Sequence, residues 1–222
     1  MGLILHIDTS AGVAAVSLAE KGRVLHYVEN KQVNEHAAFI QPAIKDLAAA
    51  AKVSLAELDA VAVANGPGSY TGLRVGLASA KGICYALSKP LITIGTLPLM
   101  AHAAALKEQR DDILYAPMID ARRMEVFTGL YNSVGNEEMP PIAKILTNDF
   151  LVAKLLQSKI LFFGTGAAKF EKICEHGNAL FSGDYSMIDA LAQLAYEAYK
   201  AHRFADLAYV EPLYLKEFYT GR

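Results

Sequence analysis

Short apolar runs alternate with segments of helical periodicity along the first half of the chain. Five runs rich in Val, Ile, Leu and Ala predict strands. They cover residues 3–7, 13–19, 24–28, 58–64 and 91–94. Residues 35–52 and 70–87 carry apolar side chains at spacings of three and four, which predicts two helices. The first half therefore has the predicted order βββαβαβ.

The second half repeats this pattern. Strands are predicted at residues 113–118, 124–131, 142–146 and 160–163, and helices at 148–156 and 186–202. The stretches "HIDTSAGVAAVSL" and "MIDARRMEVFTGL" each contain an apolar strand, an aspartate, a turn and a second strand, and they align Asp8 with Asp120. Because the order of the following elements also repeats, we predict two related βββαβα lobes.

The repeat predicts an α/β protein with a boundary near residues 95–105. We expect an N-terminal lobe of residues 1–100, with partner-binding helices, and a C-terminal lobe of residues 101–222, whose long final helix can pack back on the first lobe. A duplicated domain of this kind is the arrangement of the actin, Hsp70 and sugar-kinase ATPases. In those proteins the first hairpin of each lobe faces a cleft and holds nucleotide phosphates.

Composition narrows the class of protein. Hydrophobic residues make up 53% of the 222 residues and charged residues 20%, which permits a large core and argues against disorder. A formal net charge of −2 argues against a free-standing nucleic-acid-binding protein, because neutralising phosphates needs surplus Lys and Arg. No apolar run reaches the ~18–20 residues of a membrane span. With no signal peptide and two distant cysteines, Cys84 and Cys174, we expect a cytoplasmic protein without a disulfide framework.

Metal and hydrolase chemistry have little support. The six histidines are no closer than ten residues to one another, so the common helical metal pair with a four-residue spacing is absent. Ser69 in "PGSYTG" lacks the second glycine of a G-x-S-x-G elbow, and no histidine can be assigned to it as a base. We therefore expect no metal site and no catalytic residue.

A nucleotide site is the other candidate chemistry. Asp8, Thr9, Ser10, Asp120 and Arg122 follow corresponding strands, where an aspartate can hold Mg²⁺ and an arginine can meet an anion. The alternative is that the two aspartates cap hairpin turns and that Arg122 pairs with a local acid. "TSAGVAAV" has a single glycine and so makes no glycine-rich phosphate loop. We expect no cofactor on this chain.

The glycine-rich segment "NGPGSYTGLRVG" at residues 65–76 is not a Walker A loop, because Gly-Lys-Ser/Thr is missing. Ser69 is placed as the N-cap of the helix at 70–87. Within that helix Gly72, Gly76 and Ala80 repeat every four residues, and Gly76 should cost ~1 kcal/mol relative to alanine. Small residues at this spacing let another element approach closely. That element is either part of the same chain or a helix of a partner.

The helix at 35–52 carries two apolar stripes, of which only one can face the sheet. The second stripe indicates an interaction surface. We therefore favour a partner interface formed by both helices. The residues expected there are His36, Phe39, Ile40, Ala43, Tyr70, Gly72, Leu73, Gly76, Ser79, Ala80 and Ile83.

Four segments together resemble one family. "ILHIDTS", "ANGPGSYTGLRVGLASAKGICYAL", "MIDARRMEVFTGLY" and "EPLYLK" are similar to the TsaB family, the partner subunits of bacterial tRNA threonylcarbamoyladenosine synthesis. The resemblance covers essentially the whole chain. The wider family has a glycoprotease-like label and includes the catalytic paralogue TsaD, whose metal-binding H-x-x-x-H pair is replaced here by His36 followed by Phe39 and Ile40.

The resemblance implies a non-catalytic subunit required for threonylcarbamoyl transfer to the adenosine beside the anticodon, in tRNAs that read codons starting with A. It implies binding to TsaD and TsaE homologues, pairing of two copies through the same helical face, and tRNA contact only within the complex. ATP and a metal ion would belong to the partner subunits. The alternatives are a stand-alone ATPase or kinase using Asp8 and Asp120, and, less favoured, a peptidase.

Overall fold

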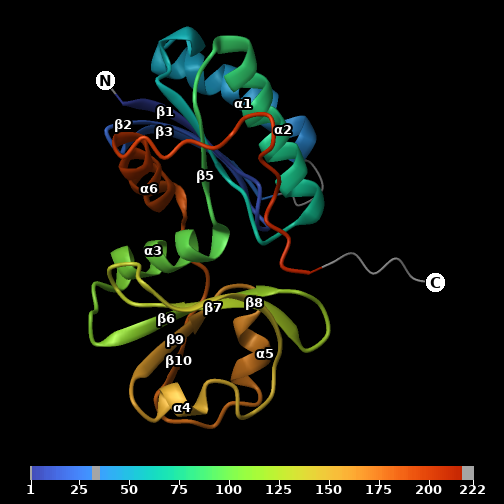
Figure 1. The fold of residues 1–222 in the computed structure, drawn as a ribbon, viewed down its shortest axis with the longest axis vertical. Coiled ribbons are helices and arrows are strands. Elements are labelled where there is room, and N and C mark those ends of the chain that lie inside the picture. The colour runs from blue at the N-terminus through green and yellow to red at the C-terminus, as the bar shows by residue number, and fades with distance from the viewer. Residues whose placement is uncertain (1, 32–35, 217–222) are drawn as a thin grey trace, which may run out of the picture. The chain divides into compact units, whose positions relative to one another are not determined.

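Apolar strands at the start of the chain form the centre of a five-stranded sheet. The structure is a computed structural model that describes residues 2–31 and 36–216. The strands of the first sheet are β1 (Leu3–Asp8), β2 (Ala14–Glu20), β3 (Arg23–Asn30), β4 (Ala60–Ala64) and β5 (Leu91–Ile94). Their order is β3-β2-β1-β4-β5, in which β1 pairs antiparallel with β2 and parallel with β4 (Figure 1).

Three helices cover the two faces of this sheet. α1 (His36–Ala51) and α2 (Tyr70–Leu87) lie on one face, and α6 (Ile188–Lys200) lies on the other. Successive residues of a strand point to opposite faces, so Leu5 of β1 packs in the cluster with α1 and α2, whereas Ile4 packs against α6.

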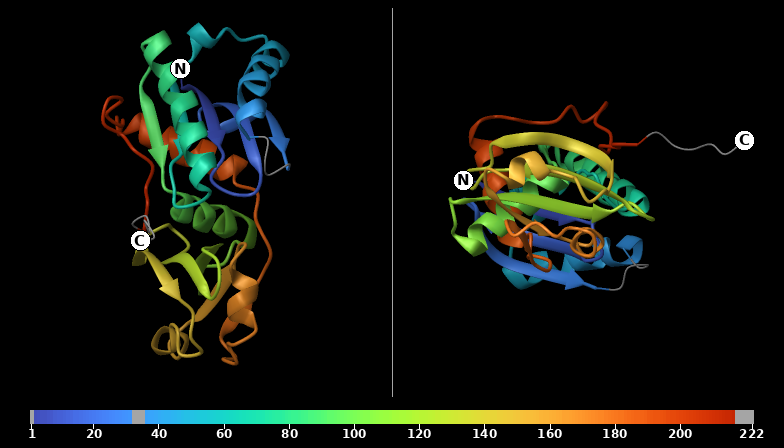
Figure 2. Two further views of the ribbon diagram at one scale, coloured as in Figure 1. Left: turned by 90° about the vertical axis from the view of Figure 1, so that its right-hand side faces the viewer. Right: turned by 90° about the horizontal axis from the view of Figure 1, so that it is seen from below.

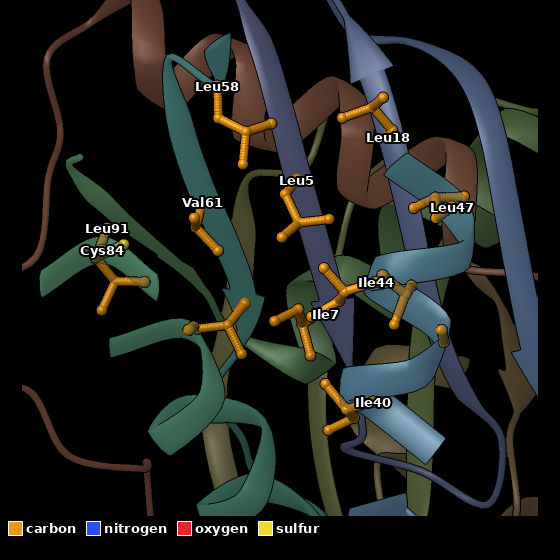
Figure 3. Packing of buried hydrophobic residues seen from close by; sticks show 14 of the residues in the cluster. Leu5, Ile7, Leu18, Ile40, Ile44, Leu47, Leu58, Val61, Cys84 and Leu91 are labelled. Carbon is orange, nitrogen blue, oxygen red and sulfur yellow. The ribbon is translucent and has the colours of Figure 1, made fainter. Parts of the chain in front are cut away.

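The largest apolar cluster of this unit lies between the sheet and the helix pair. Figure 3 shows Leu5 and Ile7 of β1 beside Ile40 and Ile44 of α1, with Val61 of β4 next to them. All five side chains are at most 2% exposed. A short 3₁₀ helix (Leu55–Glu57) joins α1 to β4. Burial of apolar area in this cluster is the main force that holds α1 and α2 on the sheet.

A second five-stranded sheet forms the core of the other unit. Its strands are β6 (Ile113–Asp120), β7 (Glu125–Tyr131), β8 (Glu137–Ile145), β9 (Lys159–Phe163) and β10 (Ala179–Phe181), in the order β10-β9-β6-β7-β8. The short helices α4 (Val152–Leu155) and α5 (Ala167–Glu171) pack Leu155 and Phe170 against β6, β7 and β9. Figure 2 shows α5 lying along this sheet.

The two units repeat the same plan. Each has the element order βββαβαβ, and in each the first strand lies at the centre, between the second and the fourth. The prediction of an α/β protein with two related βββαβα lobes is confirmed. The repeat is unequal in its helices, since α1 and α2 have 16 and 18 residues whereas α4 and α5 have 4 and 5.

The chain returns to the first unit at its end. The first unit consists of Met1–Leu99 and Met187–Leu213, and the second of Met100–Ser186 and the chain from Tyr214 on. The division at residues 99 and 100 falls next to the expected one, but residues 187–213 belong to the first unit and not to a C-terminal lobe. The reason is the apolar face of α6, whose Ala195 and Ala198 pack on Ile92.

Besides the short 3₁₀ helix, three elements were not predicted, namely α3 (Thr96–Glu108), α5 and β10. The first ten residues of α3, "TLPLMAHAAA", are apolar on nearly every side, so the pattern has no polar face to reveal a helical period. α5 and β10 have only 5 and 3 residues, too few for a periodic signal. Among the described residues, no helix combines the length and apolar character needed to cross a membrane.

Candidate functional site

The end of β1 leads into a buried polar corner of the first unit. Thr9 and Ser10 are fully buried although both carry hydroxyl groups. Thr9 Oγ1 donates a hydrogen bond to the carbonyl of Gly72 at 2.7 Å, and Ser69 N donates one to Ser10 O at 2.8 Å. Both bonds join the corner to the start of α2, so buried polar groups on each side find partners.

The glycines of the opening of α2 make room for this corner. A Cβ added to Gly68 would lie 2.1 Å from Ser10 O, one added to Gly72 would lie 2.0 Å from Thr9 O, and one added to Gly76 would lie 2.3 Å from Thr9 Oγ1. No real Cβ tolerates such distances. The close approach that these small residues permit is therefore internal, and the prediction that Gly72 and Gly76 lie on a partner interface is wrong.

Ser69 is the N-cap of α2, as predicted. Its Oγ accepts a hydrogen bond from Gly72 N at 3.2 Å, which satisfies one of the N–H groups that a helix start leaves free. The glycine-rich segment is thus a helix start that is capped by its own serine and fitted against the end of β1.

Corresponding aspartates close corresponding turns in the two units. Asp8 Oδ1 accepts hydrogen bonds from Ser10 N at 2.9 Å and from Ser10 Oγ at 2.7 Å. Asp120 Oδ1 accepts one from Arg122 N at 2.6 Å. This geometry fits the interpretation in which the aspartates cap turns two residues onward. Arg122 contributes its backbone N–H, and the expected ion pair of its side chain is not among those of the described residues.

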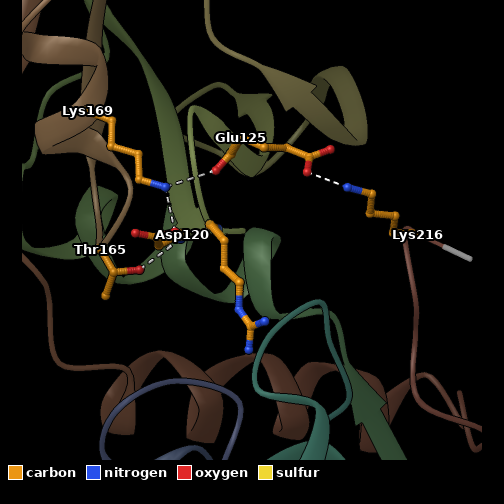
Figure 4. A network of polar contacts seen from close by, with 6 residues as sticks. Asp120, Glu125, Thr165, Lys169 and Lys216 are labelled. Carbon is orange, nitrogen blue, oxygen red and sulfur yellow. Dashed lines mark hydrogen bonds and ion pairs between the residues drawn. The ribbon is translucent and has the colours of Figure 1, made fainter. Parts of the chain in front are cut away.

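A lysine neutralises the aspartate of the second unit (Figure 4). Lys169 Nζ lies 2.6 Å from Asp120 Oδ1 and 3.3 Å from Glu125 O. Burial of Asp120 raises its pKa, but the hydrogen bonds from Lys169 and Arg122 outweigh burial and hold the pKa below its ordinary value. Glu125 in turn pairs with Lys216. The candidate nucleotide residues are therefore divided into Asp8, Thr9 and Ser10 in one unit, and Asp120 and Arg122 in the other.

Residues 2–31 and 36–216 contain no group of three or more His, Cys, Asp or Glu side chains able to hold a metal ion.

Most of the expected interface lies inside the first unit. Ile40, Ala43, Leu73 and Ala80 are at most 4% exposed. A side chain buried by its own chain cannot contact a partner, so the prediction is wrong for these four residues. Phe39 and Ile83 are partly buried and pack against the same cluster, while Tyr70 is 38% exposed. The side chain of His36 lies outside the described residues.

An open hollow lies between α1 and α2. Its volume is about 510 Å³. It is lined by Gln41 and Leu55 and, from α2, by Ala78, Ser79, Gly82, Ile83, Ala86 and Leu87. Only Ser79 and Ile83 belong to the predicted interface. We call this feature the α1–α2 hollow.

Gly82 is the unexplained glycine of α2. It lies in the middle of the helix and is exposed, and a Cβ placed on it would have no atom within 4 Å. Gly82 thus bears the ~1 kcal/mol cost of glycine in a helix without the internal reason that Gly76 has. Gly82, Ala78 and Ala86 were not among the residues predicted for the interface. The signal was present, since Ser79, Gly82, Ile83 and Ala86 follow the spacing of one helix face.

The segment after α6 is tied to the same helix. Lys81 Nζ of α2 donates hydrogen bonds to Ala208 O at 3.4 Å and to Val210 O at 3.2 Å. Leu213 N donates one to Asn65 O at 2.7 Å, just before the glycine-rich turn. The "EPLYLK" segment is therefore hydrogen-bonded, at its beginning, to the residue just before the glycine-rich turn that leads into α2.

Comparison with known proteins gives a consistent result. A family model described as "TsaD: tRNA N6-adenosine threonylcarbamoyltransferase" matches residues 23–218. The tRNA threonylcarbamoyladenosine biosynthesis protein TsaB of Haemophilus influenzae is 29% identical over 99% of this chain and 95% of its own length. The protein of the same name from Bacillus subtilis is 30% identical over 78% of this chain and 75% of its own length.

A solved structure extends the likeness to the whole fold. YeaZ from Pseudomonas aeruginosa is similar with a TM-score of 0.81 and 25% identity, and the match covers 97% of this chain and 100% of that one. The family model matches far more than half of the chain, and the relatives match along most of their length. The chain therefore belongs to the TsaB family, within the group of proteins described by the TsaD model.

Proposed function

We propose that this chain is the non-catalytic partner subunit in the formation of threonylcarbamoyladenosine on tRNAs that read codons starting with A. In this proposal it acts by binding and organising the TsaD homologue of its host, and a TsaE homologue joins the complex. The relatives are named for this biosynthesis, and the family model bears the name of the transferase. tRNA would contact the chain only within the complex, in the cytoplasm.

The observation that carries this proposal is the exposed Gly82 in the α1–α2 hollow. A helical glycine without a neighbour of its own chain lowers the stability of the monomer, so its role is expected to lie in an assembly. Small residues such as Ala78, Gly82 and Ala86 let a partner helix approach closely, and exposed apolar surface between two helices is typical of a docking face. A second copy of the chain would occupy the same face when the TsaD homologue is absent.

The arrangement of the acidic residues supports a non-catalytic role. Asp8 Oδ1 already accepts two hydrogen bonds from Ser10, and Asp120 is neutralised by Lys169. A stand-alone ATPase would need carboxylates available to hold Mg²⁺ or to orient water. We therefore assign ATP and the metal ion of the reaction to the partner subunits.

Gly82→Leu tests the docking face. The open space around Gly82 admits the new side chain, and leucine is a better helix former than glycine by up to ~1 kcal/mol. We expect the melting temperature of the isolated chain to stay or rise, while its affinity for the TsaD homologue, measured by calorimetry, falls at least tenfold. The isobutyl group would fill the hollow that receives the partner.

Ala168→Leu is the matched control, because it adds similar bulk to an exposed position on α5 in the other unit. It should bind the TsaD homologue with unchanged affinity. Wild-type affinity in Gly82→Leu would refute the assignment of the hollow as the docking face.

A further inference from the structure

An ammonium group lies within a set of oxygen atoms where β6 ends and α5 begins (Figure 4). Lys169 Nζ contacts the carboxylate of Asp120 at 2.6 Å and the carbonyl of Glu125 at 3.3 Å. Thr165 Oγ1 accepts a hydrogen bond from Asp120 N at 3.1 Å. The side chain of Lys169 is only 20% exposed. Carboxylate, carbonyl and hydroxyl oxygens are also the donors that hard divalent cations prefer.

Main-chain contacts between β6 and the turn before α5 fix the position of Lys169. Gly164 has a φ of +95°, and a Cβ on it would lie 2.6 Å from Met118 O, so the turn after β9 fits tightly against β6. Gly166 N donates a hydrogen bond to the same carbonyl of Met118 at 2.9 Å. α5 starts at the next residue. The position of Lys169 is therefore set by main-chain contacts between β6 and the turn.

The resemblance to the nucleotide-binding fold implies Mg²⁺ near these aspartates, but the residues present do not fit a metal ion. Asp120 Oδ1 holds two donors at 2.6 Å, Lys169 Nζ and Arg122 N. A divalent cation on that oxygen would lie beside the ammonium group and be repelled by it. The neighbouring carboxylate of Glu125 is engaged by a second lysine, Lys216.

The corresponding aspartate of the first unit does not fit a metal either. Asp8 is 4% exposed, and its Oδ1 accepts hydrogen bonds from both Ser10 N and Ser10 Oγ. In each unit, Oδ1 of the aspartate already accepts hydrogen bonds from donors of the chain itself.

We propose that Lys169 is a built-in cation, which takes at Asp120 the place that a metal ion would take in a nucleotide-binding relative of this fold. Its charge balances Asp120, and its second hydrogen bond ties the β6–β7 turn to α5. The second unit thus keeps the polar corner of the fold without a bound metal.

Lys169→Met in the full-length chain removes the charge and keeps most of the side chain. We expect its melting temperature to fall by about 2–4 °C, the shift that a small loss of stability produces in a chain of this size. Added Mn²⁺ at millimolar concentration should restore part of this loss, because Asp120 is then open to a divalent cation. The restoration should vanish in the double variant Lys169→Met/Asp120→Asn.

Lys172→Met is the control, since Lys172 is exposed at the end of α5 and should leave the melting temperature unchanged. Sodium chloride of equal ionic strength separates specific binding from screening. The proposal is overturned by any one of three results. These are a Lys169→Met variant no less stable than the control, a loss that Mn²⁺ does not restore, and Mn²⁺ binding by the wild-type chain that Asp120→Asn abolishes.

Discussion

His6 lies in the interior of the first unit, on the central strand. Its Nδ1 contacts Ser17 O at 3.3 Å, and its Nε2 has no hydrogen-bonding partner among the described residues. A carbonyl can only accept, so Nδ1 carries the proton and Nε2 is left as an unprotonated acceptor. Burial disfavours the charged imidazolium and lowers the pKa of His6 to about 4, against the weaker opposing effect of the bond to Ser17.

This pKa predicts acid sensitivity of the fold. Between about pH 4 and pH 6.5 the unfolded chain binds a proton at His6 that the folded chain excludes. Stability therefore rises with pH across that window and is lost on acidification, by about 3 kcal/mol in total for a shift of this size. When urea unfolding is measured at a series of pH values, His6→Gln should lower the slope of the free energy of unfolding against pH. The decrease should correspond to about one proton fewer taken up on unfolding. An unchanged slope in the variant would contradict the assignment.

Single residues show which parts of the site could be predicted from the sequence. Ser69 as an N-cap and the two aspartates at turns were predictable, because their partners lie two or three residues away. The bond from Thr9 to Gly72 spans 63 positions, and that from Lys169 to Asp120 spans 49. Such contacts leave no local pattern in the sequence. The role of Gly72 and the neutralisation of Asp120 could therefore be recognised only in the structure.

At the scale of elements, the approach of α2 to the end of β1 decides what the small residues do. The four-residue spacing of Gly72, Gly76 and Ala80 correctly indicated close packing, but it could not indicate the surface that approaches. A stripe on a helix has the same appearance whether it meets its own sheet or a partner. The structure separates the cases, because Gly76 faces Thr9 Oγ1 whereas Gly82, on the same helix, faces open space.

Gly76→Ala tests this packing. The new methyl group would lie 2.3 Å from Thr9 Oγ1, and overpacking of this kind costs about 1–3 kcal/mol. We expect a lower free energy of unfolding by chemical denaturation, although alanine is the better helix former. In a Thr9→Ala background the nearest Thr9 atom becomes the Cβ, at 3.6 Å, so the same substitution should cost clearly less.

Gly82→Ala serves as the control in the same helix. With no atom within 4 Å of the added Cβ, it should raise the free energy of unfolding by up to ~1 kcal/mol. Equal effects of alanine at positions 76 and 82, or no coupling between Gly76→Ala and Thr9→Ala, would show that the approach of α2 to β1 is not as described.

At the scale of the whole molecule, the internal repeat was the most predictable feature. The βββαβαβ order of the first unit and the βββαβ order that opens the second follow from hydrophobic periodicity, and both sheets have the corresponding strand order. The sequence predicted that the final helix can pack on the first lobe. It did not predict that the segment after this helix, up to residue 213, also belongs to the first unit. The hydrogen bonds from Lys81 to the segment after α6 could not be predicted from periodicity. Backbone carbonyls accept them, and every residue has a backbone carbonyl.

The molecule combines a duplicated βββαβαβ scaffold with carboxylates to which its own groups donate hydrogen bonds. Asp8 is satisfied by Ser10 and Asp120 by Lys169, while the α1–α2 hollow presents a helical glycine to the outside. The activity proposed for this chain is therefore an effect on another subunit. We propose that the chain is required for the transferase reaction and does not perform it.

The most direct measurement is reconstitution of tRNA modification, with threonylcarbamoyladenosine quantified by mass spectrometry of digested tRNA. The reaction contains threonylcarbamoyl-adenylate, tRNA, ATP and the TsaD and TsaE homologues of the host, with or without this chain. We expect product only when the wild-type chain and the TsaD homologue are both present, and little product with Gly82→Leu. Product formed by this chain without the TsaD homologue, or by the TsaD homologue without this chain, would contradict it.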